Sequence, residues 1–125
     1  TYEAANFAGF YVKIGRQVTI NAIVQLASSI TGGGSGDAII GGLPFNYDAS
    51  DNYGCGPVML NNVDIGGDSV GTIAITRSSA SDASTLNIAQ SFDSGTTGAE
   101  VEIIGISDFR ATSYVRFNWT YFAAT

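Results

Sequence analysis

The stretch from Phe7 to Leu26, FAGFYVKIGRQVTINAIVQL, decides the fold. From Val18 onwards every second residue is apolar, and the alternate positions are polar except at Ile23. A period of two predicts a β-strand with one buried face, because successive side chains of a strand point to opposite sides of the sheet. Ile23 indicates that part of the outer face is covered as well. The residues of the predicted buried face are Val18, Ile20, Ala22, Val24 and Leu26.

An aromatic-rich run, Phe7 to Lys13, precedes this strand and is separated from it by a short turn. Gly15-Arg16 suits a two-residue hairpin of type II′, whose first central residue needs a positive φ that glycine adopts easily. The sequence therefore predicts a long antiparallel hairpin near the N-terminus. The opposing pairs in this register are Tyr11 with Ile20 and Gly9 with Ala22.

The rest of the chain alternates short apolar runs with turns rich in Gly, Ser and Asn. Further strands are predicted at residues 37–40, 58–60, 63–65, 70–76, 85–89, 101–104 and 113–122, with a turn at Asn61-Asn62. The last run is the most aromatic, and we expect its Trp119 in the core or at a subunit interface. No run has helical spacing with caps over ten or more positions. These patterns predict an all-β, antiparallel β-sandwich or jelly-roll-like fold of roughly eight strands, without substantial helix, as one domain over residues 1–125.

The composition narrows the classes of partner. Charged residues make up 13% of the 125 residues, about half the usual share. The surface must therefore be built mostly from Ser, Thr, Asn and Gly, which suits a crowded assembly or an extracellular particle. The net charge of −6 would repel phosphate backbones, and no apolar run approaches the length of a membrane span. We expect no nucleic-acid partner and no membrane insertion.

The sequence offers few groups for catalysis. Histidine is absent, which excludes the Ser-His-Asp and Cys-His nucleophile pairs. We therefore expect no enzymatic activity, no metal and no cofactor. Glu100 and Glu102 have the spacing of a glycosidase pair, but solvent-facing glutamates two residues apart are common. Cys55 is the single cysteine of the sequence, so the chain forms no internal disulfide. Two interpretations of Cys55 are open: a small, partly buried turn residue, or a thiol that is reactive or forms an inter-chain bridge.

One polar loop combines aromatic and hydrogen-bonding side chains in the way that a sugar site needs. Aromatic faces stack on sugar rings, while carboxylates and amides bind hydroxyl groups. The alternative is a plain loop whose aromatic residues cap the end of the core and whose aspartates cap turns. The candidate glycan-binding residues are Tyr47, Asp48, Asp51, Asn52 and Tyr53.

Two separated motifs carry a family resemblance. Gly9-x-Tyr11-x-Lys13-x-Gly15-x-x-Val18, then a Gly/Ser loop, then Gly42-Leu43-Pro44-Phe45, resembles the C-terminal domain of bacteriophage tail fibres and tailspikes. The resemblance covers nearly the whole chain, with residues 117–121 as the closing strand. It assigns structural roles to the motif, with Gly15 in the turn and with Pro44 and Phe45 at a strand exit and in the core. It carries over no binding residue.

The resemblance implies a trimeric β-sandwich knob, the terminal module of a longer fibre or spike protein, on the virion and outside the cell. The expected partners are two further copies of the chain and a host surface polysaccharide or receptor protein. Two alternatives remain open: a capsid-decorating or purely trimerising virion module, and a carbohydrate-binding module of a bacterial enzyme. The missing initial Met agrees with a processed or excised part of a longer protein.

Overall fold

The computed structural model describes residues 4–27, 36–48, 50, 54–65, 70–78, 83–93 and 99–125. These residues form eight strands and one short 3₁₀ turn, η1, and every strand pair is antiparallel. The prediction of an all-β, antiparallel, sandwich-like fold of about eight strands is confirmed. The elements are β1 Ala4–Ile14, β2 Gln17–Leu26, β3 Ile39–Ile40, β4 Cys55–Val63, β5 Val70–Arg77, β6 Leu86–Asp93, β7 Ala99–Ile103, η1 Ile106–Asp108 and β8 Phe109–Phe122.

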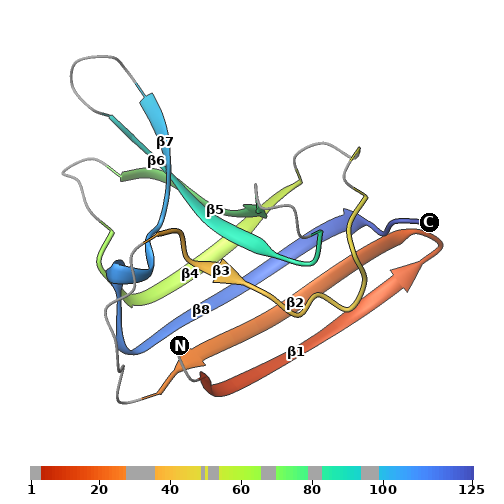
Figure 1. The fold of residues 1–125 in the computed structure, drawn as a ribbon, viewed down its shortest axis with the longest axis horizontal. Helices are drawn as coiled ribbons and strands as arrows, with labels where there is room; N and C mark the ends of the chain where they lie inside the picture. The colour runs from red at the N-terminus through yellow and green to blue at the C-terminus, as the bar shows by residue number, and fades with distance from the viewer. Residues whose placement is uncertain are drawn as a thin grey trace.

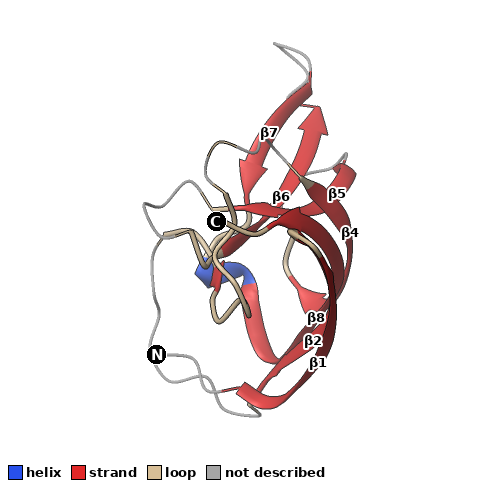
Figure 2. Cartoon of the chain, turned by 90° about the vertical axis from the view of Figure 1, so that its right-hand side faces the viewer, coloured by secondary structure: helices blue, strands red, loops and turns tan. Residues whose placement is uncertain are grey.

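The strands form one curled sheet in the order β1-β2-β8-β4-β5-β6-β3, and β7 also pairs with β6. Figure 1 shows β1 at one margin and the β6–β7 pair at the other. β4 belongs to both halves, because its residues 58–63 pair with β8 and its residues 55–57 pair with β5. The sheet curls into an arc whose concave side holds η1 and several loops (Figure 2). The two layers of the sandwich are therefore two halves of one continuous sheet.

The N-terminal hairpin has the predicted register. Tyr11 lies opposite Ile20 and Gly9 lies opposite Ala22. Gly15 adopts a φ of 59°, as the first central residue of the predicted turn requires. A period-two pattern and a two-residue turn fix this register locally, because a slip by one residue would turn the apolar face to solvent.

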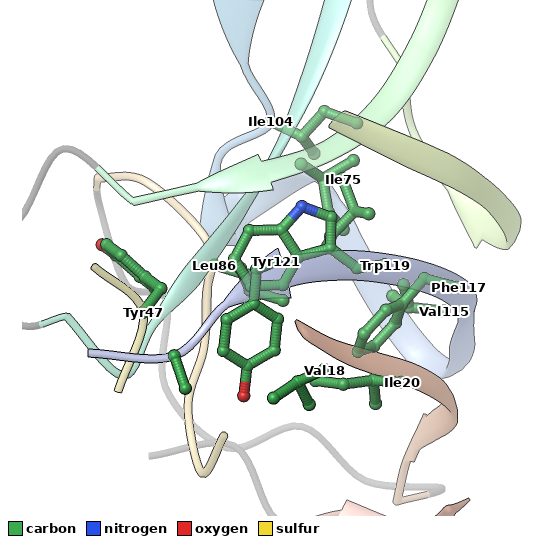
Figure 3. Close-up of a cluster of buried hydrophobic side chains, with 12 residues drawn as sticks. Val18, Ile20, Tyr47, Ile75, Leu86, Ile104, Val115, Phe117, Trp119 and Tyr121 are labelled. Carbon is green, nitrogen blue, oxygen red and sulfur yellow. The ribbon is translucent and has the colours of Figure 1, made fainter. Parts of the chain in front are cut away.

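The core lies on the concave side and is centred on β8 (Figure 3). Alternate residues of β8 are buried, and Trp119 is 2% exposed, stacked on Tyr121 at 4.6 Å between ring centroids. Trp119 is thus a core residue, as one of the two predicted placements had it. Its indole N–H donates a hydrogen bond to the carbonyl of Gly54 at 3.0 Å, which satisfies the buried donor.

The predicted turn at Asn61-Asn62 is wrong, because β4 runs through it to Val63. The chain instead forms an irregularity in the ladder with β8 between Asn61 and Val63. Asn62 has a φ of 57°, a conformation that asparagine tolerates better than most residues, and its amide donates to the carbonyl of Ala111 at 2.8 Å. The same residue type that signals a turn here makes a bulge.

The two halves of the sheet meet tightly at Gly56 of β4. A Cβ atom at this position would lie 2.0 Å from the carbonyl oxygen of Asn118 and 3.1 Å from a methyl group of Ile75. Only glycine permits this approach of the β4 and β8 backbones. The glycine thus sits at the joint between the two layers.

Candidate functional site

β1 carries a concentration of exposed apolar side chains. The exposed fractions are 77% for Phe7, 67% for Phe10, 51% for Tyr11, 55% for Val12 and 77% for Ile14. The hairpin register divides these residues between two faces, because opposite residues of a strand pair point to the same side. Phe7 and Tyr11 lie on the core side. Phe10, Val12 and Ile14 lie on the convex side, and we call these three residues the outer ridge.

The backbone edge of β1 is also open. β1 pairs with β2 on one side, and no strand in the described ranges pairs with its other side. A strand of 11 residues is about 36 Å long, so this edge presents a long row of unpaired peptide groups. Natural proteins usually protect such an edge with charges, proline or a short strand, and β1 contains one charged residue, Lys13, and no proline. An edge of this kind is typical of a surface that another chain covers.

A groove adjoins β1 on the core side. Its volume is about 650 Å³, and it lies between the inner face of β1 and β2 and the segment 37–44. Val18 and Ile20 at the start of β2 are buried, whereas Ala22, Val24 and Leu26 are only half-buried and line this groove. Among the residues that the structure describes, the predicted buried face of β2 is therefore only partly covered. We call this feature the β1–β2 groove.

The two halves of the sequence motif meet in space beside the groove. The ring of Tyr11 packs edge-to-face on the ring of Phe45, with 5.5 Å between centroids. The ammonium group of Lys13 lies 4.1 Å from the centre of the same ring, a cation–π contact. On the other side, the hydroxyl of Tyr121 donates to the carbonyl of Phe45 at 2.9 Å. Residues from β1 and from the end of β8 are thus joined around Phe45, which is half-buried against the core.

The remaining motif residues shape the backbone or pack against neighbouring segments. Gly42 has a φ of 84°, which favours glycine, and Leu43 packs against the core. Pro44 is exposed and lines the β1–β2 groove. A Cβ on Gly9 would lie 3.1 Å from the Cβ of Ala22, so this glycine lets the two strands approach closely.

The candidate glycan loop is only partly described. Tyr47 is 5% exposed, its ring packs edge-to-face on Trp119 at 5.9 Å, and its hydroxyl donates to the carbonyl of Ser78. Its face is therefore not free to stack on a sugar, and Tyr47 caps the core as the alternative interpretation proposed. Asp51, Asn52 and Tyr53 lie outside the described residues, so a sugar site built on them stays a prediction.

Asp48 is held by its neighbours. Its carboxylate accepts hydrogen bonds from the hydroxyl and the backbone N–H of Ser50, at 2.6 and 3.0 Å, and pairs with Arg16 at 2.5 Å. The hydrogen bonds from Ser50, followed by Arg16, lower the pKa of Asp48 below its ordinary value of 3.8. Arg16 also donates to the carbonyl of Ala123 at 3.0 Å. Arg16 thus joins the β1–β2 turn both to Asp48 and to the C-terminal segment.

The described residues hold no group of three or more His, Cys, Asp or Glu side chains able to bind a metal ion. Glu102 accepts a hydrogen bond from the amide of Gln90 at 3.2 Å and is exposed; the side chain of Glu100 lies outside the description. Cys55 is an exposed free thiol on β4, so the prediction of a partly buried turn residue is wrong. No helix in the described part is long and apolar enough to cross a membrane.

Comparisons with protein-family models, with curated proteins and with solved structures found no match to this chain. The surface that stands out is thus identified by its physical properties alone. The outer ridge was missed at the sequence level, although a signal was present. Phe10, Val12 and Ile14 alternate with Tyr11 and Lys13, so β1 has apolar residues on both faces, the pattern of a strand covered on both sides.

Proposed function

We propose that this chain is the homotrimeric tip module of a bacteriophage tail fibre or tailspike, which joins three chains and meets the host cell surface. The motif pair and the low charge support the resemblance, and the antiparallel sandwich-like fold agrees with it. The location that follows is the virion, outside the cell.

The observation that carries the self-association is β1. β1 has 11 residues, exposed apolar side chains on both faces and an open edge. Burial of this apolar area against another chain would be strongly favourable, and the unpaired edge can accept a further strand. A structural module that functions as an oligomer accounts for this surface.

The experiment that tests the trimer is the native mass of the purified chain, measured by light scattering over a concentration series. The expected result is the mass of three chains, unchanged on dilution. A mass of one chain throughout would contradict the trimer and favour the carbohydrate-binding module. Calcium-dependent melting of that monomer would strengthen the latter, since a ligand of the folded state raises stability.

Host binding needs its own test. The trimer is applied to an array of bacterial surface glycans, and Tyr53→Ala and Asn52→Ala are compared with Val101→Ala, a change on the remote strand β7. Tyr47→Ala is unsuitable because the ring lies in the core. Binding that is lost in the first two variants alone supports the glycan site. A trimer without any glycan binding would contradict that site and favour the purely trimerising or decorating role.

A further inference from the structure

We draw no further inference here: the strongest candidate, the apolar β1–β2 groove beside the outer ridge, carries no proposal, because nothing in the structure shows what covers it.

Discussion

The β1 edge and the β7 edge border the same sheet, yet they differ in length, charge and exposure. β7 has five residues, two of which are glutamates, and it shares one side of β6 with the two-residue β3. β1 has 11 residues, a single charge and apolar side chains on both faces. Short strands and charges protect an edge from pairing with another chain, so β7 has the features of a protected edge and β1 lacks them. A single exposed apolar residue does not indicate a binding surface, since Val101 on β7 is 75% exposed. A whole strand of exposed apolar residues, as in β1, does indicate one.

The largest effect is expected at the joint between the two edges. Gly56→Ala places a Cβ 2.0 Å from the carbonyl of Asn118, so β4 and β8 must separate at the point where the halves of the sheet meet. Such overpacking costs about 3 kcal/mol or more in free energy of unfolding. Urea denaturation followed by circular dichroism measures this loss. In the control Gly41→Ala, the nearest atom lies 3.9 Å from the new Cβ, and stability should change by less than about 0.5 kcal/mol. Equal stability of both variants would refute the joint.

The comparison of the edges is tested by the same substitution on both. Val12→Lys on β1 buries a charge in the proposed contact, whereas Val101→Lys on β7 adds one more charge to a free edge. We expect Val12→Lys to weaken association by at least about 1.4 kcal/mol, a factor of ten, and Val101→Lys to leave it unchanged. Sedimentation velocity at several concentrations measures both. If the two variants dissociate alike, the edges do not differ in the way we infer.

A smaller effect is expected for the contact between β1 and Phe45, which involves Tyr11 but not Phe7. The edge-to-face contact of Tyr11 with Phe45 holds the inner face of β1 to the chain's own core. A double-mutant cycle with Tyr11→Leu and Phe45→Leu should give a coupling energy of about 0.5–1.5 kcal/mol. The corresponding cycle of Phe7→Leu with Phe45→Leu should give a coupling near zero. These energies are measured by chemical denaturation at a fixed oligomeric state, and similar couplings for both pairs would argue against a specific anchor.

The smallest effect is a pH dependence at the turn that ends β1. Because the pKa of Asp48 is lowered in the folded chain, its contribution to stability is present above the ordinary value of 3.8 and is lost as the pH falls through the folded value. Acid should therefore lower the melting temperature of the native chain slightly more than that of Asp48→Asn. Melting curves by circular dichroism from about pH 6 downwards measure the difference. Parallel curves for the two proteins would show that the hydrogen bonds of Ser50 and the Arg16 pair contribute nothing.

The sequence predicted local features well. The register of the N-terminal hairpin, the turn at Gly15 and the buried face of β8 follow from side-chain alternation and turn chemistry, which act over a few residues. The turn predicted at Asn61-Asn62 failed because asparagine in a left-handed conformation serves both turns and bulges. Pairing with β8 decides between them, and that strand lies about 50 residues further along the chain. For Tyr47 the sequence left two interpretations open, a sugar-binding ring and a cap on the core, and the packing of its ring against Trp119 decides for the second.

By itself, the sequence determined that this protein is all-β, that its N-terminal hairpin has one register and that its chemistry excludes histidine-based catalysis. These properties depend on residue type and on periodicity, both of which can be determined directly from the amino-acid sequence. Only the tertiary structure decided that β2 pairs with β8, that β4 joins both halves of the sheet and that Phe45 lies beneath Tyr11 and Lys13. It also decided that β1 is the strand at the margin of the described sheet. Such pairings depend on the shared burial of segments far apart in the chain, and no local pattern specifies which segments will meet.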